Sequence, residues 1–223
     1  MRHMGKSAGF DVHSPEPGAG EPARARLLDA ATHLFCRYGI NATGVDAVIG
    51  EAKTAKTTLY KIFGSKEGLI EAVLEREGER WREWFISGID SGNAAPRSKL
   101  MRIFPLLKQW FSEERFYGCP FINAVGEHDK ADDRMRAIAI RHKTVVLRKI
   151  ESLVAEAGIA PAASVAHQIG LLIDGAIIAA MVTRNPGVAD DGGVLLRLLL
   201  ERGKPAGRKQ PAARSAAADT VAV

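Results

Sequence analysis

Apolar residues recur at helical spacing in the first third of the chain, and this periodicity limits the possible folds more than any other feature. The stripe consists of Leu27, Leu28, Ala31, Leu34, Phe35 and Tyr38. Such spacing places all six on one face of an α-helix, and Gly39 is suited to end that helix. No stretch of the sequence shows the alternation that is typical of strands. We therefore predict an all-α fold.

Two short helices and a long one are expected next. Thr43 to Asp46 has the form of a capping box, which predicts a helix over 45–51. A break at residues 52–54 separates it from a third helix that ends before Gly64. We expect Thr54 to be the N-cap of that helix, because alanine at position 55 cannot cap. Ser65 then caps a fourth helix that runs through Trp84.

Further helices are predicted near 96–111, 121–125, 132–157, 161–183 and 188–202, with a kink at Pro105. The ends, 1–20 and 203–223, have the composition of disordered tails. We expect an N-terminal three-helix helix-turn-helix DNA-binding domain over 21–68. A C-terminal helical ligand-binding and dimerisation domain is expected over 69–202.

The third helix has two chemically different faces. Leu59, Ile62 and Phe63 form a face to be buried, whereas lysines, hydroxyls and a tyrosine occupy the other. A helix-turn-helix requires this division, since its second helix packs on neighbours and inserts its free face into the major groove of DNA. Phosphate contacts suit Tyr60, Lys61 and Lys66. The predicted DNA-binding residues are Thr43, Lys53, Thr54, Lys56, Thr57, Thr58, Tyr60, Lys61 and Lys66.

Charge and cysteine content narrow the class of protein without specifying it. Of the net charge of +5, residues 202–223 contribute +4 (five basic residues and Asp219), so residues 1–201 carry only +1. The tail is either a solubilising extension or a source of nonspecific DNA affinity. Cys36 and Cys119 are far apart in the sequence, which argues against a disulfide framework and suits the cytoplasm. The most apolar stretch, 169–182, is too short to span a bilayer.

The segment ARARLLDAATHLFCRYGINATGVDAVIGEAKTAKTTLYKIFGSKEGLIEAVL resembles the N-terminal domain of TetR-type bacterial transcriptional regulators. The resemblance implies a DNA-binding domain of three helices, a variable all-α domain that binds ligand and dimerises, and usually repression that a small molecule relieves. Positions that lie against DNA in the family match Thr43, Lys56, Thr58, Tyr60, Lys61 and Lys66. Family members usually have glycine where this chain has Lys53 and an apolar residue where it has Thr54. If the turn needs positive φ, Lys53 costs about 1 kcal/mol.

Aromatic and polar residues gather between positions 110 and 128. Aromatic walls with a few polar groups suit a pocket for a small apolar molecule, although ordinary core packing explains the same spacing. The predicted ligand-binding residues are Trp110, Phe111, Phe116, Tyr117, Cys119, Phe121, Asn123 and Glu127. The GCPFIN element is similar to a common subgroup of the family. Cys119 is either a redox sensor or, as we expect, an ordinary buried thiol. We predict no metal site and no cofactor.

A helix over 161–183 would be apolar on nearly every side, which indicates burial against partner helices. Pairing with the helix over 132–157 across a two-fold axis would form a four-helix interface between two copies of the chain. The predicted dimerisation residues are Val146, Ile150, Gly170, Leu171, Asp174, Ile178 and Met181.

The sequence therefore favours a cytoplasmic, homodimeric repressor that binds an inverted repeat in double-stranded DNA and responds to a small-molecule effector. An enzyme is disfavoured, because the sequence shows no nucleophile–base motif and no phosphate loop. Two alternatives remain open: a transcriptional activator of the same fold, and a nonspecific DNA-binding protein.

Overall fold

The computed structural model describes residues 22–129, 131, 133–202 and 204–205. The predicted tails, 1–20 and nearly all of 203–223, lie outside the described residues. The fold is all-α, as predicted, apart from two strands of two residues each. These strands, β1 (Ile159–Ala160) and β2 (Lys204–Pro205), pair antiparallel.

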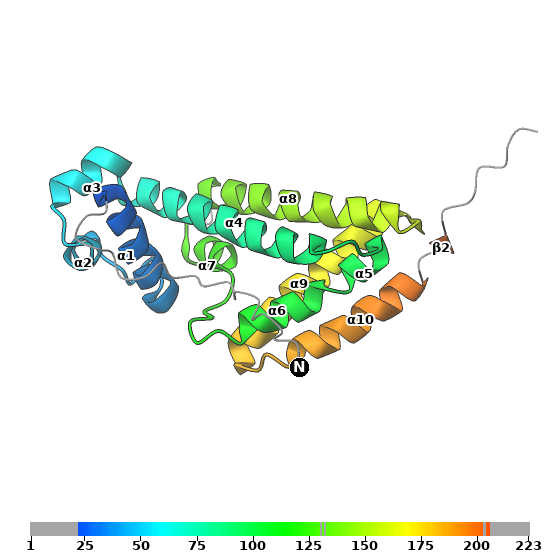
Figure 1. Ribbon diagram of the computed structural model, residues 1–223. Helices are drawn as coiled ribbons and strands as arrows, with labels where there is room; N and C mark the ends of the chain where they lie inside the picture. Colours follow the sequence, from blue (N-terminus) through cyan, green and yellow to red (C-terminus); the bar gives the residue numbers. More distant parts are fainter. Residues whose placement is uncertain (1–21, 130, 132, 203, 206–223) are drawn as a thin grey trace, which may run out of the picture.

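Three helices form a small bundle at one end of the elongated molecule (Figure 1). They are α1 (Ala23–Tyr38), α2 (Val45–Glu51) and α3 (Lys56–Phe63). The predicted stripe of α1 is buried, with Leu27 and Leu28 packed in one core with Val48 and Leu59, whereas Tyr38 is exposed. Gly39 ends α1 at φ 90°, a backbone conformation that glycine adopts without strain.

The long helix α4 (Lys66–Asp90) connects this bundle to the rest of the chain. Ser65 caps it, as predicted, because its side chain accepts a hydrogen bond from the Gly68 N–H over 3.0 Å. The prediction that α4 ends near Trp84 was wrong. The helix continues because Phe85 and Ile89 extend its buried face by two more turns.

The predicted helix over 96–111 is two helices, α5 (Pro96–Leu100) and α6 (Ile103–Phe111). The predicted kink at Pro105 was misplaced, because the break lies at Met101 and Arg102. Pro105 is the third residue of α6. A helix leaves its first N–H groups without intrahelical partners, so proline removes no hydrogen bond at that position.

Four more helices complete the fold: α7 (Pro120–Glu127), α8 (Arg134–Glu156), α9 (Ala162–Thr183) and α10 (Val188–Arg202). α8 lies along α4, and α9 packs between α8 and α10 (Figure 1). α9 is 22 residues long and confirms the predicted helix over 161–183 to within one residue, and the apolar stretch over 169–182 is only part of it. Among the described helices, α9 is the one that could cross a bilayer by length and composition. Here it is a core helix, with Val165, Ile169 and Ile173 buried.

Candidate DNA-binding surface and internal cavity

The turn between α2 and α3 holds a lysine in the left-handed region. Lys53 has φ 48°, so the turn does need the positive φ at which a residue other than glycine is strained. The N–H of Thr54 donates to the Ile49 carbonyl over 3.1 Å, and the Arg26 Nε–H donates to the Ala52 carbonyl over 3.1 Å. These bonds fix the turn, and they orient α3 relative to α1.

The N-cap of α3 is Ala55, so the prediction that Thr54 caps this helix was wrong. No side chain makes a capping hydrogen bond there. The predicted capping box of α2 is absent as well, since Gly44 is its N-cap and has no side chain. Both helices are held by burial, with Val48 at 1% exposed and Leu59 at 0%.

The outer face of α3 carries most of the predicted DNA-binding residues. Lys56, Thr57, Tyr60 and Lys61 are exposed, and Thr58 is half-buried. The Lys56 ammonium lies 2.9 Å from Asp46 of α2, and this hydrogen bond raises the lysine pKa. Lys53 is also exposed, in the preceding turn. The result is a continuous polar surface of hydroxyls and positive charges.

Two predicted DNA contacts face inward instead. Thr43 is only 3% exposed, and its hydroxyl donates to the Gly39 carbonyl over 2.7 Å. Lys66 is half-buried, and its ammonium donates to the Ile40 carbonyl over 2.7 Å. Because both side chains fasten the loop between α1 and α2, we do not retain either as a DNA contact.

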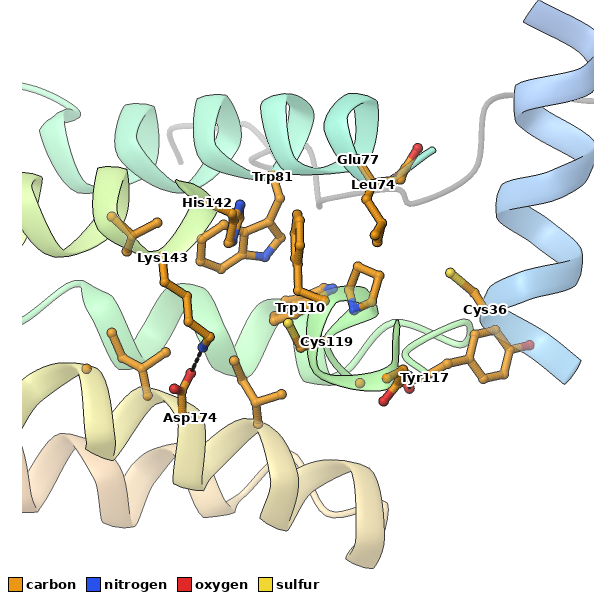
Figure 2. Close-up of a pocket in the computed structure, with 18 of the residues that line it drawn as sticks. Cys36, Leu74, Glu77, Trp81, Trp110, Tyr117, Cys119, His142, Lys143 and Asp174 are labelled. Atoms are coloured by element: carbon orange, nitrogen blue, oxygen red, sulfur yellow. Dashed lines mark hydrogen bonds and ion pairs between the residues drawn. The ribbon is translucent and has the colours of Figure 1, made fainter. Parts of the chain in front are cut away.

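Helices of the C-terminal part, together with the end of α1, line a cavity of about 300 Å³ (Figure 2). Five of the eight predicted ligand residues line it: Trp110, Tyr117, Cys119, Phe121 and Asn123. Phe111 and Phe116 do not. Their rings pack against Trp110, with centroid distances of 5.9 and 5.1 Å, and so belong to the surrounding core.

Glu127 is not part of the cavity wall, contrary to the prediction. Its carboxylate accepts from the Asn41 N–H over 2.9 Å, and its backbone carbonyl accepts from the Asn41 amide over 2.7 Å. The C-terminal end of α7 is thus tied to the loop between α1 and α2, while Phe121 at its start faces the cavity. α7 connects the cavity to the N-terminal bundle.

Sequence reasoning missed the cavity residues of α1, α4 and α8. They include Cys36, Glu77, Trp81, His142 and Lys143. One feature of the sequence does indicate Glu77: it is an acidic residue on the otherwise apolar stripe Ile70, Val73, Leu74 and Trp81 of α4. Across the cavity, the Lys143 ammonium pairs with Asp174 over 2.5 Å (Figure 2).

The titratable groups of the cavity are strongly affected by burial. Burial raises the pKa of the Cys36 thiol to about 12 and also raises that of Cys119, so both remain protonated thiols near neutral pH. Burial, with Arg82 and Lys143 nearby, lowers the pKa of His142 to about 3. The neutral imidazole accepts from the Arg82 guanidinium over 3.1 Å through Nδ1.

Most of the predicted dimerisation residues pack within the chain. Val146 and Ile150 are buried at the cavity, Asp174 is paired with Lys143, and Met181 contacts Gly118. Gly170 lies against Leu147, where an added Cβ would come within 2.8 Å of that side chain. α8 and α9 therefore pack on each other inside one chain, and of the predicted set only Leu171 and Ile178 are exposed.

An apolar surface that sequence reasoning identified only at Leu171 and Ile178 covers the outside of α9 and α10. We call it the α9–α10 face, and its exposed members are Leu171, Ile178, Val182, Val194, Leu195 and Leu198. Leu171 is 73% exposed and Val182 is 71% exposed. Clustered exposed apolar residues on a folded domain indicate a contact with another molecule.

Comparison with known proteins agrees with this architecture. Residues 27–73 match the family model described as bacterial regulatory proteins, tetR family. The chain is 25% identical over 183 residues to an uncharacterized HTH-type transcriptional regulator in the lacX 3' region of Lactococcus lactis subsp. lactis. That match covers 80% of this chain and 93% of the relative. A 60-residue segment is 35% identical to the HTH-type transcriptional regulator UidR of Escherichia coli (strain K12), and it covers 27% of this chain and 31% of UidR.

A solved structure, SCO4454, a TetR-family transcriptional regulator from Streptomyces coelicolor, has the same fold with a TM-score of 0.73. It is 27% identical, and the match covers 80% of this chain and 94% of that one.

His142 makes the stability of the fold depend on pH. The unfolded chain binds a proton at this residue near pH 6.5, whereas the folded chain does so only near pH 3. The contribution of the neutral His142 to the free energy of unfolding is therefore fully present above pH 6.5, and it is lost as the pH decreases toward 3. Between pH 7 and pH 5 the free energy of unfolding should fall by about 2 kcal/mol more in the wild type than in His142→Gln. Urea titrations at both pH values and equal protein concentration measure this difference. Parallel losses in the two proteins would contradict it.

Proposed function

The chain belongs to the TetR family of bacterial transcriptional regulators, and from this premise we propose that it is a cytoplasmic, homodimeric repressor. It binds an inverted repeat through α3 and leaves the DNA when a small molecule enters the cavity. The observation that supports this proposal best is the division of α3, whose inner face is buried while its outer face presents hydroxyls and lysines.

The outer face of α3 has the chemistry that the major groove requires. Thr57 and Lys56 lie in the first turn, the end from which a recognition helix contacts base edges. Tyr60 and Lys61, one turn later, suit phosphate oxygens on the flanking backbone. Lys53 in the turn adds a third group for phosphate. Base readout is therefore assigned to the start of α3 and positioning to its second half.

The double variant Tyr60→Ala plus Lys61→Ala should bind all DNA sequences more weakly and keep its sequence preference. Because the variant removes one positive charge from each subunit, and the uncharged Tyr60 releases no counterion, the slope of log affinity against log salt should decrease by about 2 for the dimer. Fluorescence anisotropy over a salt series measures both quantities. Lys108→Ala on α6, which removes one positive charge far from α3, serves as the control (Figure 1). An unchanged affinity and an unchanged salt slope in the double variant would remove Tyr60 and Lys61 from the interface.

The dimer forms through the α9–α10 face. Its members recur on α9 at Leu171, Ile178 and Val182, so they follow one side of the helix along three turns. A symmetric dimer buries the same patch on both copies and places two α3 helices about 34–36 Å apart, one turn of DNA. This assignment replaces the interface between α8 and α9 that the sequence indicated.

Leu171→Glu should shift the protein toward monomer, because it places a charge within an apolar interface. We expect the dissociation constant of the dimer to rise by at least about tenfold, which corresponds to about 1.4 kcal/mol. Sedimentation velocity over a concentration series measures this change. Ile140→Glu introduces the same charge at an exposed apolar position of α8 and should leave the dimer intact. Dissociation caused by the α8 variant alone would place the interface on α8.

Ligand-dependent release rests on the position of α7. A molecule in the cavity contacts Phe121 and Cys119 at the start of this helix, and Glu127 at its end holds Asn41 of the N-terminal bundle. Displacing α7 therefore moves the loop that precedes α2. Release requires that the ligand binds better to the conformation in which the two α3 helices do not match the DNA repeat.

Selection of bound duplexes from a random DNA library with the purified protein tests the proposal. An enriched inverted repeat supports a sequence-specific dimer. Binding without enrichment that disappears at moderate salt would instead indicate a nonspecific DNA-binding protein. A reporter gene placed behind the enriched site then separates repression from activation, since expression falls in the first case and rises in the second.

A further inference from the structure

Two buried polar atoms of α4 lack hydrogen-bond partners beside the cavity. Glu77 is 2% exposed and Trp81 is 7% exposed, and both line the cavity. Within the part of the chain that the structure describes, no group bonds Glu77 Oε2 or Trp81 Nε1. The residues are four apart and so lie on the same side of the helix. Folded proteins rarely leave such atoms unsatisfied, so these two indicate where a bound molecule makes its polar contacts.

The charge of Glu77 is already balanced. Its other oxygen, Oε1, lies 3.4 Å from both the Arg76 and the Arg80 guanidinium groups, and Arg76 also pairs with Asp29 over 2.7 Å. Two carboxylates therefore face two guanidinium groups. A cationic ligand would add an excess positive charge at this end of the cavity. An uncharged donor of a hydrogen bond satisfies Oε2 without that cost.

The adjoining walls favour a flat apolar molecule. The Trp81 ring stacks on Phe85 with centroids 4.5 Å apart and meets Trp110 edge-on at 5.5 Å. Ile70, Val73 and Leu74 continue the wall along α4. Figure 2 shows Leu74 on the same helix as Glu77 and Trp81. Aromatic rings of a ligand pack well against such surfaces, and a cavity of about 300 Å³ has the size of a small-molecule site.

We infer that the cavity binds an uncharged aromatic molecule with a hydroxyl group, whose O–H donates to Glu77 Oε2. A hydroxyl is the simplest uncharged group that donates a hydrogen bond to a carboxylate. This inference deepens the proposed function, on which it rests for the role of the cavity as the effector site.

Direct binding without DNA tests the inference. Isothermal titration calorimetry compares 2-naphthol with 2-methoxynaphthalene, which keeps the rings and the oxygen but has no O–H. The wild type should bind 2-naphthol about 10- to 100-fold more tightly, as expected for a hydrogen bond to a charged acceptor. In Glu77→Leu the preference for 2-naphthol should disappear. This variant also shows whether the methyl group of 2-methoxynaphthalene alone weakens binding, because a steric effect would remain in it. Equal binding by the wild type, or no binding of either compound at its solubility limit, overturns the inference.

Three further variants keep the test decisive. Glu77→Gln preserves the shape of the side chain and should reduce the preference to a few-fold, so it replaces Glu77→Leu if that variant does not fold. Trp81→Phe leaves a smaller aromatic ring in the wall. It should therefore weaken the binding of both compounds, while the preference for the hydroxyl remains. Glu79→Gln, at an exposed position of the same helix, should change nothing. A preference that survives in both Glu77 variants overturns the inference.

The two proposals fail separately. Loss of the 2-naphthol preference, in a protein that still selects an inverted repeat, removes the ligand assignment alone. A protein that prefers 2-naphthol through Glu77 but enriches no DNA site retains the ligand assignment and loses the repressor function.

Discussion

The Arg76 guanidinium makes the contact on which the connection between the two halves of the molecule depends. It donates to Asp29 over 2.7 Å and to Thr32 over 2.9 Å, both on α1, and it lies 3.4 Å from Glu77 in the cavity wall. Thr32 and Glu77 are both buried. Removing one partner of a buried ion pair strongly destabilises the fold, because the other charge stays buried without a partner. Arg76 therefore provides one link between the cavity and the orientation of α1, and with it that of α3.

A second link runs through α7, and the two links differ in kind. Arg76 joins two helices by charge, whereas Glu127 and Asn41 join a helix end to a loop by two hydrogen bonds. Lys66 adds a third bond to the same loop at the Ile40 carbonyl. The loop between α1 and α2 is thereby fixed from two directions, by α7 and by the start of α4. A displacement of either helix is transmitted to the N-terminal bundle through contacts rather than through a flexible linker.

The sequence predicted the N-terminal bundle well because its determinants are local. The buried stripe of α1, the turn at Lys53 and the cap at Ser65 each depend on residues close together in the chain. The cap predicted at Thr43 was wrong because its hydroxyl donates to the end of α1 instead. The cap predicted at Thr54 was wrong because α3 begins one residue later than that prediction required. Pro105 was misread for a related reason, since proline breaks a helix only where an N–H is needed.

The cavity was only partly predictable because its walls come from distant segments. Trp110, Cys119 and Phe121 lie within one aromatic stretch, whereas Trp81 and His142 reach the same space from α4 and α8. Periodicity identifies a buried face but not the helix that covers it. This explains why Val146 and Ile150 were assigned to a second copy of the chain, when other helices of the same chain bury them at the cavity.

The position of Glu77 also limits how a ligand can act on DNA binding. A ligand shifts a conformational equilibrium only by its difference in affinity for the two states. A hydrogen bond at Oε2 is made to the same carboxylate whose Oε1 faces Arg76, so the bond strength depends on where Arg76 holds that group. Asp29 and Thr32 of α1 hold the Arg76 guanidinium. A movement of α1 that draws this group away from Glu77 would leave the Glu77 carboxylate less neutralised. By linkage, a ligand whose affinity depends on the position of α1 would shift the equilibrium between the positions of α1 by the same free energy.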